Sequence, residues 1–187
     1  MIRILGISGS LRAGSYNTAL LRAAQSQAGN TIELEIATLH GIPLYDGDLE
    51  QRDGLPEAVT SLKEQIVASS GVLLATPEYN NGIPGVFKNA IDWLSRPSSD
   101  IARVFAGRPF ALIGASPGGF GTILAQNAWL PVLRTLGVRH WTGGRLMVSR
   151  ASQVFDEQGE IRDEAVRGQL ARFLTGFAAF ASETPAR

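Results

Sequence analysis

Residues 2–18 decide the fold, and they read IRILGISGSLRAGSYNT. The first six of these residues, 2–7, are apolar apart from Arg3 and rich in β-branched side chains, which predicts a short buried strand. The loop that follows is dense in glycine, serine and other hydrogen-bond donors, and a helix is predicted from Asn17 to Ala28 with Asn17 or Ser15 as its N-cap. A strand that passes through small residues into a helix N-terminus brings backbone amides and the positive end of the helix dipole together. Such a loop is suited to hold a phosphate group.

The rest of the chain alternates predicted strands and helices. Thr31 to Ile36 alternates apolar and polar residues, as a strand exposed on one face or near a sheet edge does. Two other segments, 71–75 and 109–114, are apolar throughout, which is typical of a parallel sheet covered on both faces. A last strand is predicted around 138–148. Helices are predicted at 56–69, 86–95, 122–136 with an interruption or a kink near Pro131, and 164–181. The pattern predicts an α/β protein with a flavodoxin-like doubly wound parallel sheet of five strands in the order 2-1-3-4-5, with helices on both faces.

The length and composition predict one domain. A chain of 187 residues is long enough for one substantial core, and we find no linker, internal repeat or low-complexity tract. We therefore expect a single domain over 1–187, with residues 182–187 as a frayed tail.

The charges and the missing residue types exclude several classes of protein. Lys and Arg together number 17, as do Asp and Glu, so no net charge favours nucleic acid or an anionic membrane. The absence of cysteine and the presence of only two histidines argue against a metal site. No signal-peptide pattern and no apolar run of roughly 18 residues is present. We expect a cytoplasmic protein with no nucleic-acid partner and no membrane insertion.

Three loops are expected to form the ligand site. In doubly wound sheets ligands bind outside the carboxyl ends of the strands, at the point where the strand order reverses. This rule selects the loops 8–16, 76–85 and 115–121, which are also the loops richest in glycine, serine, asparagine and proline.

The first loop matches neither of two common phosphate-binding motifs. A Walker loop requires a lysine where this chain has Ser15, and a dinucleotide fingerprint requires glycines where it has Ser8 and Leu11. The remaining interpretation is a pocket for one terminal phosphate, bound mainly by hydroxyls and amides. The alternative is that Gly9 and Gly14 only turn the chain while the serines cap a helix.

The second and third loops suit a flat ligand. TPEYNNGIPG, residues 76–85, is stiffened by two prolines, and its Asn-Asn-Gly segment permits a tight turn. Such a loop would line the edge of a planar heterocycle, although it could also be a long connection with Tyr79 packed in the core. The third loop, SPGGFG at 116–121, allows a backbone to approach a flat ligand closely, or is merely a glycine-rich turn.

Two motifs together carry a family resemblance. GSLRAGSYN and PEYNNGIPGVFKNAIDWLSRP resemble the NADPH-dependent FMN reductase family, whose members include flavodoxin-like quinone, chromate and azo-dye reductases. The likeness covers nearly the whole chain. It implies that the first loop grips the FMN phosphate through Ser10, Arg12, Ser15, Tyr16, Asn17 and Thr18. It also implies that the second loop lines the isoalloxazine with Pro77, Glu78, Tyr79, Asn80 and Ile83, and that the third contributes Ser116, Gly118 and Gly119.

The resemblance also implies an activity. Hydride would pass from NADPH or NADH through FMN to a quinone or a similar small acceptor, such as chromate, an azo compound or free flavin, by a ping-pong mechanism. The chemistry would be centred on the flavin, with no obligatory catalytic side chain, and Arg12 and Tyr79 would contact substrate or NADPH. A homodimer or homotetramer is implied, and Asn89 to Leu94 would suit a dimer contact.

Two other functions remain open at this point. A flavodoxin-type electron carrier would have the same fold and FMN but no turnover of its own, although such carriers are usually acidic and this chain is neutral. A flavin-free module for a phosphosugar or nucleotide would need only the first loop. Among the remaining polar residues, Arg103, Arg108 and Arg145 are expected to be solvated surface charges.

Overall fold

Six strands form one parallel sheet in the computed structural model, which describes residues 1–183. The strands are β1 Ile2–Ser8, β2 Ile32–Ala37, β3 Gly71–Ala75, β4 Pro109–Ala115, β5 Arg139–His140 and β6 Leu146–Val148. Their order is β2-β1-β3-β4-β5, and β6 also pairs with β4. The predicted flavodoxin-like order 2-1-3-4-5 is confirmed.

Strand burial follows the sequence pattern. Every residue of β3 and β4 is buried, as expected for apolar strands at the centre of a covered sheet. β2 alternates buried and exposed positions along most of its length and lies at the edge of the sheet, next to β1. The prediction for segment 31–36 is therefore confirmed.

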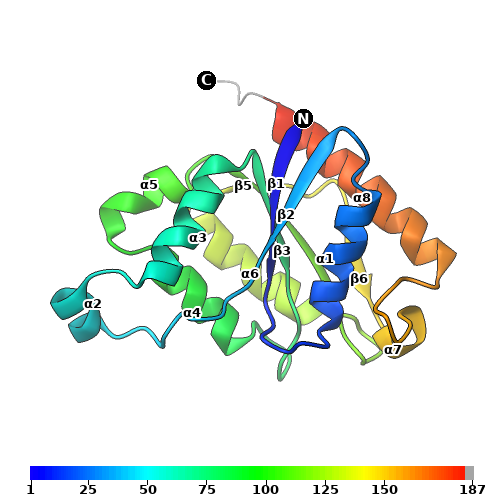
Figure 1. Cartoon of the computed structure of the whole chain (residues 1–187), viewed down its shortest axis with the longest axis horizontal. Coiled ribbons are helices and arrows are strands. Elements are labelled where there is room, and N and C mark those ends of the chain that lie inside the picture. The colour runs from blue at the N-terminus through cyan, green and yellow to red at the C-terminus, as the bar shows by residue number, and fades with distance from the viewer. Residues whose placement is uncertain (184–187) are drawn as a thin grey trace.

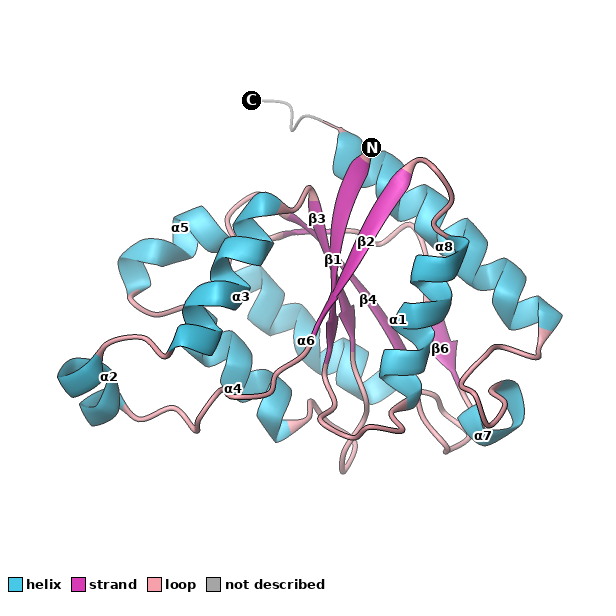
Figure 2. Ribbon diagram, viewed as in Figure 1, coloured by secondary structure: helices cyan, strands magenta, loops and turns pink. Residues whose placement is uncertain are grey.

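Helices cover both faces of the sheet (Figures 1 and 2). On one face lie α1 Tyr16–Gln27, α7 Ala151–Val154 and α8 Glu164–Ser182; on the other lie α3 Glu57–Ala68, α4 Gly85–Leu94, α5 Ile101–Val104 and α6 Ile123–Thr135. The helix α2 Gly47–Asp53 and a 3-10 turn at Ser98–Asp100 belong to the connections. Each face has its own apolar cluster, since Ile4 of β1 packs into the α1 and α8 cluster and Leu5 into the α3, α4 and α6 cluster.

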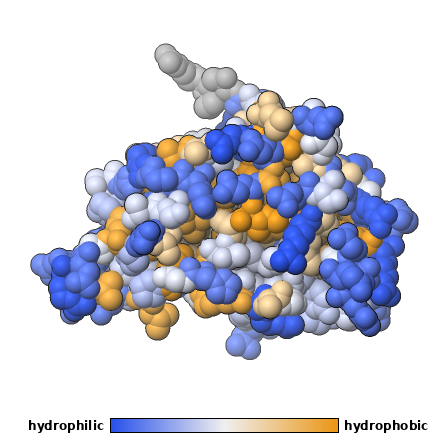
Figure 3. Space-filling view, viewed as in Figure 1, coloured by the Kyte–Doolittle hydropathy of each residue, from blue (hydrophilic) through white to orange (hydrophobic). Residues whose placement is uncertain are grey.

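The surface is mostly hydrophilic over α2 and over the outer end of α8, whereas hydrophobic residues emerge near the edge strand β2 (Figure 3). No helix within residues 1–183 is long and apolar enough to cross a membrane. Of the predicted frayed tail, 182–187, Ser182 is the last residue of α8 and Glu183 is its C-cap, while residues 184–187 lie outside the described residues.

The predicted last strand at 138–148 is wrong in one respect, because it is two short strands. Trp141 leaves the sheet after β5 and packs edge-on against Phe173 of α8, with ring centroids 4.7 Å apart. The backbone of Gly143 and Gly144 packs directly against this indole. A Cβ would lie 2.6 Å from the nearest ring atom at Gly143 and 2.7 Å at Gly144. The chain therefore makes an excursion around Trp141 before it rejoins β4 as β6.

The segment Asn89–Leu94, expected at a dimer contact, is used mainly within the chain. Four of its residues are buried in α4: Ala90, Ile91, Trp93 and Leu94. The Trp93 indole donates to the Pro43 carbonyl at 2.9 Å, and Asn89 bonds the same loop. This expectation is wrong for the apolar side chains of the segment, because they belong to the core.

Arg103 is exposed as expected, although it is paired with carboxylates, whereas Arg108 is half-buried and bonded within the fold. Arg103 donates to the carboxylates of Asp100 and Glu64. Half-buried Arg108 donates to the carbonyls of Val104 and Ser69 at 2.9 and 2.8 Å, and burial lowers the pKa of its guanidinium. Arg145 is exposed as expected.

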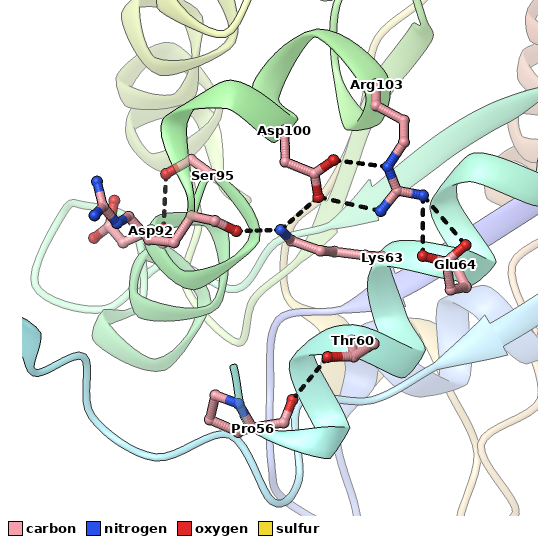
Figure 4. Close-up of polar contacts among 9 residues, drawn as sticks. Pro56, Thr60, Lys63, Glu64, Asp92, Ser95, Asp100 and Arg103 are labelled. Carbon is pink, nitrogen blue, oxygen red and sulfur yellow. Dashed lines mark hydrogen bonds and ion pairs between the residues drawn. The ribbon is translucent and has the colours of Figure 1, made fainter. Parts of the chain in front are cut away.

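Lys63 is a buried lysine of α3. Its side chain is only 1% exposed, and its ammonium bonds the Asp100 carboxylate at 2.8 Å and the Arg96 carbonyl. Asp100 lies between the Lys63 ammonium and the Arg103 guanidinium, with Glu64 on the far side of that guanidinium (Figure 4). The helical pattern alone would place a lysine at the surface.

Candidate functional site

The three loops selected from the sequence meet at the carboxyl edge of the sheet, the lower edge in Figure 1. They enclose a hollow of about 350 Å³ that is open to solvent. Its lining residues come from all three loops and from the end of β4: Ser10, Arg12, Ser15, Tyr16, Asn17, Pro77, Glu78, Tyr79, Ala115, Ser116 and Pro117.

Most of the predicted cofactor residues line this hollow. Ser10, Arg12, Ser15, Tyr16, Asn17, Pro77, Glu78, Tyr79 and Ser116 do so, whereas Thr18, Asn80, Ile83, Gly118 and Gly119 do not. Ala115 and Pro117 also line the hollow; both belong to the predicted loop 115–121 but were not named as single cofactor residues. Their position directly beyond a buried strand was the signal that could have found them.

Ser15 organises the first loop. It is the N-cap of α1, and its Oγ accepts the backbone amides of Asn17 and Thr18 at 3.2 and 3.3 Å. The amide of Tyr16, the first residue of the helix, has no acceptor within the helix. The sequence prediction left the N-cap between Asn17 and Ser15, and the structure shows Ser15.

Hydroxyls and one cation surround this helix end. The Ser10 side chain is buried, and its Oγ lies 3.4 Å from the Tyr79 hydroxyl of the second loop and accepts the Arg12 amide at 3.3 Å. Arg12 is exposed, and its guanidinium donates to the Gly14 carbonyl at 3.3 Å. Hydroxyls, an amide and a positive charge thus converge beside the positive end of the helix dipole.

Asn17 ties the first loop to the third. Its carboxamide donates to the Ala115 carbonyl and accepts the Ala115 amide, both at 2.9 Å, as a neighbouring strand would. The side chain is 3% exposed. Asn17 therefore sets the spacing between α1 and the end of β4 from inside the protein. Thr18, expected at the phosphate, instead has its hydroxyl 2.8 Å from that of Ser8.

The second loop is a tight hairpin. Tyr79 and Gly82 exchange backbone hydrogen bonds of 3.2 and 3.0 Å, and the two residues between them, Asn80 and Asn81, have φ values of 50° and 61°. Two left-handed residues in a two-residue connection form a type I′ turn, which asparagine tolerates. The tight turn predicted here is confirmed. The alternative of Tyr79 as a core residue is wrong, because its side chain is 46% exposed.

Glu78 and Thr76 bind the second loop to the body of the protein. The Glu78 carboxylate accepts the backbone amides of Leu124 and Ala125 at 2.8 and 3.0 Å. The buried Thr76 hydroxyl donates to the Pro77 carbonyl and accepts the Trp129 indole N–H at 3.1 Å. Ile83 is half-buried. It packs against the α3, α4 and α6 cluster and does not line the hollow.

The third loop is held by its own backbone and by β6. The Ser116 amide donates to the Val148 carbonyl at 2.9 Å, and its hydroxyl donates to the Gly121 carbonyl. Gly121 has a φ of 64° and abuts Met147, so that a Cβ there would lie 3.0 Å from the Met147 backbone. Gly118 and Gly119, expected in the flavin pocket, are exposed.

Gly9 brings the first two loops into contact, and its replacement tests how tightly they fit. A Cβ at Gly9 would lie 2.2 Å from Phe87 Cδ1 and 2.9 Å from Pro77 Cδ. Because Phe87 is fully buried and packs edge-on against Trp129, it has little room to move. We expect Gly9→Ala to lower the free energy of unfolding by about 1–3 kcal/mol, measured by urea denaturation.

The matched control is Gly85→Ala at the first position of α4, where a Cβ would meet no atom within 4 Å. It should change the free energy of unfolding by no more than about 0.5 kcal/mol, or stabilise slightly. Equal effects of the two substitutions would contradict the steric argument.

Comparison with known proteins identifies the family. Residues 2–153 match the model of the NADPH-dependent FMN reductase family. The chain belongs to this family. It is 45% identical over 173 residues to an NAD(P)H-dependent FMN reductase of Pseudomonas aeruginosa, covering 92% of this chain and 91% of the relative. It is 35% identical over 179 residues to a 2-hydroxy-1,4-benzoquinone reductase of Burkholderia sp., covering 96% of each.

A solved structure agrees with these relatives. FerB, a flavoenzyme NAD(P)H:(acceptor) oxidoreductase of Paracoccus denitrificans, superposes with a TM-score of 0.86 at 32% identity, covering 97% of each chain. The chain is therefore an oxidoreductase of a family that works with FMN and NAD(P)H. This supports the enzyme interpretation over an electron carrier without turnover and over a flavin-free binding module.

The residues of the hollow fit FMN by their chemistry. Two hydroxyls, the free Tyr16 amide and the Arg12 guanidinium suit a phosphate group. Pro77, Tyr79 and Pro117 offer flat, largely apolar walls at the other loops. A hollow with one charged polar end and flat walls is complementary to a phosphorylated planar ring.

Proposed function

We propose that this chain is an NAD(P)H-dependent FMN reductase that holds FMN in the hollow between its three loops and delivers electrons to a quinone or a similar small acceptor. When bound, FMN would supply the two-electron chemistry that links NAD(P)H to the acceptor. The observation that carries the proposal is the convergence of the first-loop hydroxyls, the Arg12 guanidinium and the second-loop hairpin on one hollow at the carboxyl edge of the sheet.

The first loop binds the phosphate end in this proposal. Ser10 and Ser15 donate their hydroxyl protons, the Tyr16 amide donates from the helix N-terminus, and Arg12 adds a positive charge from the solvent side. The Ser15 hydroxyl can donate because its oxygen already accepts two amides and its proton stays free.

The second and third loops bind and orient the ring. Pro77 and Pro117 are rigid, and the hairpin holds Tyr79 at the open side of the hollow, where its ring is half exposed. Tyr79 and Arg12 are therefore placed to contact NAD(P)H or the acceptor. Because donor and acceptor would both approach this open side, we propose that they use it in turn, by a ping-pong mechanism.

Association into a homodimer or homotetramer is part of the proposal. Leu44 is 79% exposed, and Leu124 and Leu130 of α6 are 44% and 43% exposed. Burying such side chains against a second copy would favour association.

The test is a spectroscopic titration. Protein incubated with FMN and desalted should keep a flavin absorption band that bleaches on anaerobic addition of NADPH and returns with quinone. Initial rates at several fixed quinone concentrations should give parallel double-reciprocal lines. A band that NADPH leaves unchanged would contradict the reductase proposal, and intersecting lines would contradict the ping-pong mechanism.

A further inference from the structure

The helix α6 lacks a cap from its own N-terminal residue. Thr122 occupies the N-cap position but makes no side-chain cap hydrogen bond. Its hydroxyl instead accepts the Gln126 side-chain amide at 3.1 Å and faces β4, where a Cβ on Gly114 would lie 2.0 Å from it. Because the hydroxyl points to Gln126 and β4, it leaves the amides of the first turn without a cap from Thr122.

Glu78 supplies the missing cap from the second loop. Its Oε2 accepts the amides of Leu124 and Ala125, the second and third residues of α6, at 2.8 and 3.0 Å. These are the two positions that an N-cap side chain normally serves. The first turn of α6 contains no acidic residue, so the Glu78 carboxylate is also the negative charge that the helix dipole favours at this end.

This cap joins two walls of the hollow. Glu78 stands between Pro77 and Tyr79, which both line the hollow, and α6 begins directly after the third loop. Two other contacts connect the loops around the hollow. Ser10 and Tyr79 join the first loop to the second at 3.4 Å, and Asn17 and Ala115 join the start of α1 to the third loop at 2.9 Å. A break at Glu78 would free the hairpin from the first turn of α6, while the Thr76 to Trp129 bond at the base of the loop and the other two connections stay in place.

We propose that Glu78 is a positioning residue, which fixes the hairpin to α6 so that the walls around the ring of FMN are set before the cofactor arrives. The inference rests on the proposed function and revises the expectation that Glu78 acts by lining the isoalloxazine. A loop that is already ordered pays no ordering cost on binding, so the cap increases the affinity for FMN through the hairpin.

The experiment uses the full chain in three variants. Glu78→Ala removes both bonds, and Glu78→Gln keeps a carbonyl oxygen able to accept them without the charge. Asp163→Ala is the matched control, because Asp163 caps α8 through bonds of the same lengths, 2.8 and 3.0 Å, to Ala165 and Val166. Two readouts are measured: amide hydrogen exchange in the flavin-free protein, and the Kd for FMN by quenching of flavin fluorescence.

We expect Glu78→Ala to exchange the Leu124 and Ala125 amides about five- to tenfold faster and to raise the Kd for FMN by about the same factor. Glu78→Gln should restore slow exchange and bring the Kd to within about threefold of the wild type. Asp163→Ala should speed exchange at Ala165 and Val166 and leave the Kd for FMN unchanged.

Three outcomes would overturn the proposal. Faster exchange in Glu78→Ala with an unchanged Kd would make the cap a purely structural contact. A Glu78→Gln variant as weak as Glu78→Ala, but with protected α6 amides, would show that the carboxylate itself acts on FMN. A wild-type chain that binds no FMN would overturn the proposed function as well, whereas the first two outcomes overturn this inference alone.

Discussion

Replacing Ser15 with aspartate should abolish retention of FMN while leaving the fold in place. Aspartate is as good an N-cap as serine, so α1 keeps the bonds to the Asn17 and Thr18 amides. The new carboxylate, however, puts a negative charge where the phosphate is proposed to bind, at a position only 7% exposed. Like charges about 4 Å apart near a protein surface repel by about 4 kcal/mol. We therefore expect the Kd for FMN to rise at least about 100-fold.

Fluorescence titration with FMN measures this loss, and urea unfolding checks that stability is retained. Ser15→Asn is the matched control, because asparagine caps a helix equally well and carries no charge. It should keep the Kd within about tenfold of the wild type. Equal FMN affinity in Ser15→Asp and the wild type would show that the first loop is not the phosphate site.

The sheet could be predicted from the sequence because its signals are local. The apolar segments 71–75 and 109–114 are typical of buried strands in a sheet covered on both faces, and the alternation of segment 31–36 is typical of a strand near an edge. The split of the last strand could not be predicted in the same way. It results from the packing of Trp141 against α8, which comes later in the chain, and strand propensity contains no information on that contact.

The location of the site could be predicted from the residue types in the loops, whereas the contacts of single side chains could not. Glycine, serine and asparagine after two strands indicate where a ligand binds, and nine of the predicted residues do line the hollow. Asn17 and Glu78 were expected to face the cofactor, yet their polar groups are bonded to Ala115 and to the first turn of α6. Sequence shows that a polar group must find a partner, but the partners lie 98 and 46 residues away.

Removing Asp100 should destabilise the protein by about 3 kcal/mol or more. The Lys63 ammonium, 1% exposed, would then remain buried with the Arg96 carbonyl but without its carboxylate. Leaving one member of a buried pair uncompensated typically costs about 3–5 kcal/mol, whereas replacing both by apolar groups is often neutral. We expect Asp100→Ala to show the full loss in urea denaturation and the double variant Lys63→Met, Asp100→Ala to recover at least half of it.

An exposed pair provides the control. Asp53 and Arg52 lie 2.8 Å apart with side chains 55% and 69% exposed, so Asp53→Ala should change the free energy of unfolding by less than about 1 kcal/mol. If Asp100→Ala is no worse than Asp53→Ala, or if the double variant recovers nothing, the buried ammonium does not depend on Asp100.

The same pair predicts how stability depends on pH. Hydrogen bonds from Arg103 and then from Lys63 hold the pKa of Asp100 well below its usual value, whereas in the unfolded chain this carboxyl titrates near about 4. As the pH falls below that value, the unfolded state takes up a proton that the folded state does not. The stabilisation by Asp100 is therefore complete above about pH 5 and declines below it.

The wild type should lose stability more steeply between about pH 5 and pH 3 than the double variant Lys63→Met, Asp100→Ala. Asp53, whose pKa is lowered by the neighbouring Arg52, is common to both proteins, and its contribution cancels in this difference. Equal slopes would mean that Asp100 is not held in its charged form by Lys63 and Arg103.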